Sequence, residues 1–79
     1  MAANVITLLS DFGLRDGYVA SMKGVILGIA PDARLVDISH LIAPRDIRSA
    51  AFVLFTSYGC FPHRTVHLAV VDPGVVADD

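Results

Sequence analysis

Residues 5–13 read Val-Ile-Thr-Leu-Leu-Ser-Asp-Phe-Gly, and this stretch decides the fold. Its first five residues are apolar or β-branched and give way to polar residues and a glycine, which is typical of a buried strand over 5–9 that runs into a loop. Apolar residues at helical spacing then predict a helix over 17–30, with Asp16 as its N-cap and Pro31 as its end. The chain therefore begins as a strand followed by a helix.

The same alternation continues along the rest of the chain. Residues 35–38 form a second short strand, apolar except for Asp37. Asp46 is placed to cap a second helix, and 66–71 is a nearly continuous apolar stretch that predicts a third strand. Strands that alternate with amphipathic helices predict an α/β fold of the βαβαβ type, with parallel strands covered on both faces.

Composition sets limits on how such a chain is stabilised. The 79 residues are 54% hydrophobic and 18% charged, which excludes a disordered chain. A domain near this size buries only about 60% of the surface that its unfolded chain exposes. Three parallel strands also leave two open edges. We therefore expect an incomplete part of a larger α/β domain.

Charge and cysteine content exclude several classes of partner. Six Lys and Arg against eight acidic residues give a net charge of −2, so no surface for nucleic acid is expected. The single Cys60 cannot form an internal disulfide, and the first residues do not match a signal peptide, so the expected location is cytoplasmic. The apolar runs are far shorter than the roughly 18 residues of a membrane span, so no membrane insertion is expected.

Carboxylates gather at the predicted carboxyl ends of the strands, where open parallel sheets bind their ligands. Asp11 follows the first strand and Asp72 follows the third, while Asp16 precedes the first helix. Such a rim suits a cation, hydroxyl groups or a metal and repels a free phosphate. Each residue also has a structural alternative, which is helix capping for Asp16 and turn stabilisation for Asp11 and Asp72.

Five blocks of the sequence, taken together and in this order, resemble one family. They are Ser-Asp-Phe-Gly-Leu-Arg-Asp-Gly-Tyr-Val at 10–19, Met-Lys-Gly-Val-Ile at 22–26, Asp-Ile-Ser-His at 37–40, Pro-Arg-Asp-Ile at 44–47 and Thr-Val-His-Leu-Ala-Val-Val-Asp-Pro-Gly-Val at 65–75. They are similar to the S-adenosyl-L-methionine (SAM) hydroxide adenosyltransferases, which are SAM hydrolases related to fluorinases and chlorinases. The resemblance implies the first part of an N-terminal α/β domain, in a longer protein that has a C-terminal β domain and forms homotrimers.

The resemblance also implies roles for single residues. Asp11 matches the carboxylate that holds the ribose hydroxyls, and Asp16 matches a residue near the methionine end of the substrate. Asp72 matches the catalytic aspartate of the hydrolase branch. Phe12 is included among the expected substrate-binding residues, with packing at the rim as its alternative role. SAM is then the substrate, and no cofactor or metal is implied.

The sequence departs from this family after Val75. The family continues with Gly-Thr, then an arginine that works with the aspartate and later a catalytic histidine, whereas this chain reads Val-Ala-Asp-Asp over 76–79. We therefore expect residues 1–79 to be a partial N-terminal α/β domain without the C-terminal β domain, inactive alone. Two other interpretations stay open. One is a non-catalytic adenosyl-binding or assembly module, and the other is a magnesium-dependent phosphoacceptor site of receiver type at Asp11 and Asp72.

Overall fold

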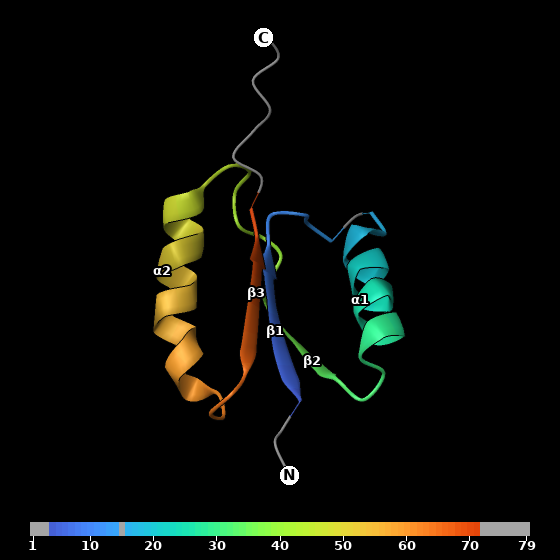
Figure 1. The fold of residues 1–79 in the computed structure, drawn as a ribbon. Helices are drawn as coiled ribbons and strands as arrows, with labels where there is room; N and C mark the ends of the chain where they lie inside the picture. Colours follow the sequence, from blue (N-terminus) through green and yellow to red (C-terminus); the bar gives the residue numbers. More distant parts are fainter. Residues whose placement is uncertain (1–3, 15, 72–79) are drawn as a thin grey trace, which may run out of the picture.

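The structure is a computed structural model, and it describes residues 4–14 and 16–71. Strands and helices alternate along the chain (Figure 1), in the order β1 (Val5–Ser10), α1 (Tyr18–Ile29), β2 (Arg34–Ser39), α2 (Ile47–Ser57), the short 3₁₀ helix η1 (Tyr58–Cys60) and β3 (Val66–Val70). All strand pairs are parallel, and the strand order in the sheet is β2-β1-β3. The predicted α/β class and βαβαβ order are therefore confirmed.

β1 is the central strand because both of its neighbours pair with it. Leu8 of β1 lies opposite Asp37 of β2 and opposite Leu68 of β3. The side chains from Thr7 to Ser10 are all buried, whereas Val66 on an edge strand is exposed. The prediction that the strands are covered on both faces therefore holds for β1 but not for the edge strands β2 and β3, whose side chains are partly exposed.

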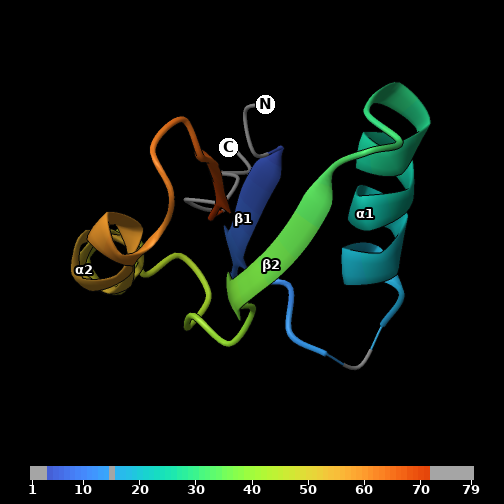
Figure 2. The same cartoon turned by 90° about the horizontal axis from the view of Figure 1, so that it is seen from below.

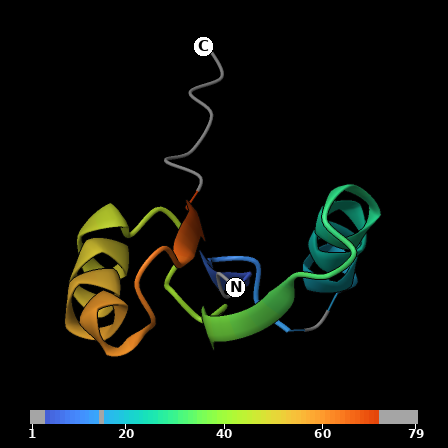
Figure 3. The same cartoon turned by 60° about the horizontal axis from the view of Figure 1, so that its bottom comes forward.

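The two helices lie on opposite sides of the sheet (Figures 2 and 3). Ala50 of α2 is buried together with Leu9 and Ile42, and this core is surrounded by partly buried apolar side chains, namely Ile38, Val53, Leu54 and Val71. In contrast, α1 has no buried residue, and Val25 and Ile29 of its predicted apolar stripe are exposed. The helical spacing predicts both helices correctly, but only α2 contributes a buried residue, Ala50, and Ile47 of the same helix is exposed.

The helices also begin differently. At α2, Asp46 is the N-cap as predicted, since one carboxylate oxygen accepts a hydrogen bond from Ser49 N at 3.0 Å and the other accepts one from Ser49 Oγ at 2.7 Å. These bonds hold the pKa of Asp46 below its ordinary value of 3.8. At α1 the cap is Gly17, and no side chain caps the helix. The prediction of Asp16 as N-cap is wrong because α1 begins one residue later than the sequence pattern indicates.

We expect Asp46→Ala to lower the free energy of unfolding, because the N–H of Ser49 loses its acceptor. Asp46→Asn keeps an acceptor oxygen and is expected to stay closer to the unsubstituted chain. Because the pKa of Asp46 is lowered on folding, its stabilisation is present above pH 3.8 and is lost as the pH falls through the folded value. Urea unfolding followed by circular dichroism measures both effects. Equal losses in the two variants would show that the charge, and not the cap, stabilises α2.

Candidate functional site

The carboxyl ends of the three strands meet at one rim of the sheet. β1 ends at Ser10 and continues into the loop that leads to α1 (Figure 1). The amide of Asp11 donates to the carbonyl oxygen of Val70 at 3.3 Å, which places the start of this loop beside the end of β3. The amide of Gly13 donates to the carbonyl oxygen of His40 at 2.7 Å, which ties the same loop to the one that follows β2. Two loops are thus joined above the central strand.

Asp11 is the first residue of the loop after β1, and it contacts the loop between β2 and α2. It is half-buried, and its Oδ2 accepts a long hydrogen bond of 3.4 Å from the amide of Arg45, in the loop before α2. Arg45 has a φ of 65°, in the left-handed region that residues other than glycine seldom adopt. Strained backbone of this kind is enriched at functional sites. The structure therefore places Asp11 at the rim, as the sequence predicts.

The other predicted site residues have different surroundings. The ring of Phe12 lies 6.0 Å from the ring of Tyr18 at the start of α1, so Phe12 also packs at the rim. Asp16 is exposed, two residues before α1. Asp72 lies outside the described residues. The residue before it, Val71, packs against the core that contains Leu9.

A chain of hydrogen bonds runs beneath this rim. Ser10 Oγ lies 2.5 Å from His40 Nδ1, and His40 Nε2 lies 2.7 Å from Asp37 Oδ1. Lys23 of α1 donates to Asp37 Oδ2 at 2.7 Å. Ser10 and His40 are 0% and 4% exposed. In the sequence, Asp37 stands out as the single polar residue of an apolar stretch, but no local pattern predicts its partners Lys23 and His40.

Asp37 receives a donor on each carboxylate oxygen. Partial burial raises the pKa of Asp37, but the hydrogen bonds from Lys23 and His40 and the charge of Lys23 outweigh this, so the pKa lies below its ordinary value of 3.8. The side chains of Lys23 and Asp37 are 32% and 41% exposed, so water screens the ion pair and its contribution to stability is small. The main effect of the pair is geometric, since it attaches α1 to β2.

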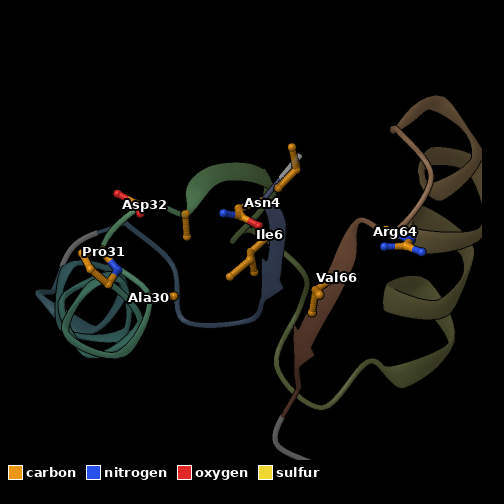
Figure 4. Close-up of a pocket in the computed structure, with 9 residues that line it drawn as sticks. Asn4, Ile6, Ala30, Pro31, Asp32, Arg64 and Val66 are labelled. Atoms are coloured by element: carbon orange, nitrogen blue, oxygen red, sulfur yellow. The ribbon is translucent and has the colours of Figure 1, made fainter. Parts of the chain in front are cut away.

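A hollow of about 280 Å³ lies at the opposite end of the sheet, where the strands begin. Figure 4 shows Ile6 in its middle, with Asp32 on one side and Arg64 on the other. The two charged groups are separated, and the lining between them is mainly apolar. The hollow therefore lacks a group of neighbouring polar side chains like the one at the rim.

Within residues 4–14 and 16–71, no three His, Cys, Asp or Glu side chains are grouped so that they could hold a metal ion. In the same residues, neither helix has the length and apolar character needed to cross a bilayer.

Comparison with known proteins identifies the family. The sequence profile of the SAM hydroxide adenosyltransferase N-terminal domain matches residues 6–79. The chain belongs to this family, and the resemblance seen in its sequence blocks is confirmed.

Relatives of this chain include hydrolases and fluorinases. An (R)-S-adenosyl-L-methionine hydrolase of Thermus thermophilus is 49% identical over 70 residues, which are 89% of this chain and 28% of that protein. A fluorinase of Nocardia brasiliensis is 35% identical over 69 residues, which are 87% of this chain and 23% of that protein. A crystal structure of an uncharacterized conserved protein from Thermotoga maritima aligns with a TM-score of 0.84 and 44% identity, covering 89% of this chain and 27% of that one. The chain thus spans 23% to 28% of the length of these relatives.

Proposed function

We propose that this chain is the N-terminal, ribose- and adenosyl-binding part of a SAM hydrolase, an enzyme that converts SAM and water into adenosine and L-methionine. The observation that carries the proposal is the position of Asp11, which is half-buried at the carboxyl end of the central strand and hydrogen-bonded to Arg45 in the loop before α2 and to Val70 of β3. The identity of 49% to a hydrolase against 35% to a fluorinase favours the hydrolase branch.

The chemistry of the rim suits this substrate. SAM is a sulfonium cation, which carboxylates attract, and one carboxylate can accept hydrogen bonds from both hydroxyls of a ribose cis-diol. We assign the ribose to Asp11, with Phe12 beside it as a further substrate contact. Asp16, at the mouth of α1, is assigned to the methionine end of SAM.

In the proposed reaction, a water oxygen held by Asp72 attacks C5′ of SAM in line with the bond to sulfur. The new C5′–O bond forms, the C5′–S bond breaks, and its electron pair stays on sulfur. Methionine therefore leaves as a neutral thioether without a general acid, and the proton of the attacking water is released. Because charge is neutralised in the transition state when the nucleophile has hydroxide character, positioning in a site that excludes bulk water accelerates the step.

Activity, assembly and location complete the proposal. The resemblance adds an arginine and a histidine to Asp72, and neither is among residues 1–79, so we propose that this chain does not turn SAM over by itself. We propose that the complete protein forms a homotrimer with its sites between subunits, as the resemblance implies. An exposed Cys60 without a disulfide partner is typical of a reducing compartment, which supports a cytoplasmic location.

Calorimetric titration with adenosine and with SAM tests the proposal. Asp11→Ala is expected to weaken adenosine binding about 10- to 100-fold, because hydrogen bonds to a charged group contribute about 1.5–3 kcal/mol. Asp32→Ala is the matched control, since it removes the same charge from an exposed residue at the other end of the sheet, and it is expected to bind like the unsubstituted chain.

Two results would count against this function. The first is equal affinity for adenosine in Asp11→Ala and Asp32→Ala, which would contradict the assignment of the ribose to Asp11. The second is an unsubstituted chain that binds neither ligand, which would favour an assembly module instead.

A further inference from the structure

His40 holds the turn after β1 at two points. Its carbonyl oxygen accepts the amide proton of Gly13 at 2.7 Å. Its Nδ1 lies 2.5 Å from Ser10 Oγ, and Ser10 Oγ accepts the amide proton of Phe12 at 3.3 Å. The two amides that follow Asp11 are thus tied to His40, one directly and the other through Ser10.

One arrangement of protons satisfies this whole chain of groups. A carboxylate only accepts, so His40 Nε2 carries a proton and donates to Asp37. In a neutral ring Nδ1 is then an acceptor, the Ser10 hydroxyl donates to it, and Ser10 Oγ remains able to accept from the Phe12 amide. With a second ring proton, two donors would converge on Ser10 Oγ, and the hydroxyl would need another acceptor. The geometry therefore favours the neutral ring protonated on Nε2.

Ser10, His40 and Asp37 have the composition of a hydrolytic triad, but they cannot act as one. Ser10 is 0% exposed, so no substrate reaches its hydroxyl. A serine nucleophile must contact the reacting carbon of the substrate. The network therefore supports the rim from beneath, and it acts by fixing the conformation of the turn above it.

We propose that His40 is a positioning residue for the substrate-binding turn 11–13. It fixes the Phe12 amide through Ser10 and the Gly13 amide through its own carbonyl, and Gly13 adopts a left-handed φ of 74°. The consequence for the ligand rests on the proposed function of Asp11, whereas the consequence for the turn does not. A displacement of about 1 Å in a binding group can cost about 10²-fold in rate, so the shape of this turn matters for the substrate.

Amide hydrogen exchange in the 79-residue chain, measured by NMR, tests the effect on the turn without any ligand. His40→Leu is expected to speed exchange of the Phe12 amide about tenfold relative to the amide of Leu8 in the core. His40→Asn, whose side-chain oxygen can still accept from Ser10, is expected to restore part of this protection. Ser10→Ala breaks the same link with a smaller change and serves if His40→Leu does not fold.

His67→Leu is the matched control. His67 is also bonded to a hydroxyl of β1, with Nδ1 2.6 Å from Thr7 Oγ1, but it lies on β3 and does not touch the turn. It is expected to leave exchange at Phe12 unchanged relative to Leu8. Equal exchange at Phe12 in His40→Leu and His67→Leu would overturn the positioning role. A wild-type His40 ring protonated on Nδ1, read from its ¹⁵N shifts, would overturn it as well.

Adenosine affinity separates this inference from the proposed function. His40→Leu is expected to weaken adenosine binding about tenfold, with His67→Leu unchanged. If the turn loosens while the affinity stays at the wild-type value, the positioning role for substrate is wrong. If the wild-type chain binds no adenosine, the proposed function fails, and hydrogen exchange still decides whether His40 sets the turn.

Discussion

Asp72→Asn is expected to lower SAM turnover about 10²- to 10⁴-fold while SAM binding is largely retained. The protein to be assayed is a full-length chimera. In it, this chain replaces the 70-residue segment that it matches in the Thermus thermophilus hydrolase. Asparagine has nearly the size of aspartate but lacks the charge with which Asp72 is proposed to hold and polarise the attacking water. Adenosine formation followed by chromatography gives the turnover, and calorimetry gives the affinity.

Asp11→Ala in the same protein supplies the contrast. It is expected to weaken SAM binding, because the ribose hydroxyls lose their acceptor, and Asp32→Ala again controls for the loss of one negative charge. The unsubstituted protein is expected to produce adenosine and methionine. Equal losses of SAM affinity in Asp72→Asn and Asp11→Ala would contradict the division of roles between the two carboxylates.

Leu9→Ala is expected to lower the free energy of unfolding by about 2–5 kcal/mol. Leu9 is 1% exposed and lies at the centre of the core with Ile42 and Ala50, so its removal leaves a cavity that partly buried neighbours cannot fill completely. Since small domains have a total stability of about 5–15 kcal/mol, this one substitution removes a large share. Urea unfolding followed by circular dichroism measures the change.

Leu41→Ala is the matched control for Leu9→Ala. Leu41 is next to the core residue Ile42 but is 69% exposed, so the same truncation is expected to change stability by no more than about 0.5 kcal/mol. Equal effects at the two positions would show that α2 does not pack on β1 as described.

The sequence predicts the secondary structure well because the signals are local. Apolar spacing places the third strand at 66–71, and the structure has it at Val66–Val70. The first helix, predicted over 17–30, is Tyr18–Ile29. A shift of one residue at its start is enough to move the cap from Asp16 to Gly17. Exposure of α1 could not be predicted, because the spacing of apolar residues defines a face but not what that face contacts.

The position of the rim could be predicted from the sequence for a similar reason. A strand end is a local feature, and parallel strands bring their ends together, which is why Asp11 is where the pattern predicts it. The pair of Ser10 and His40 joins residues 30 positions apart, and that of Lys23 and Asp37 joins residues 14 apart. Such pairs depend on how α1 and the loops are placed on the sheet, and no periodicity in the sequence encodes that placement.

Cys60 makes the chain convenient for spectroscopy. It is the only cysteine of the sequence, and it is exposed in η1, which leads into the start of β3 at the end of the sheet opposite Asp11. A maleimide fluorophore would therefore attach at one position without entering the turn that we assign to the ribose. Its anisotropy would report tumbling, and so subunit association, in the same samples that are titrated with adenosine.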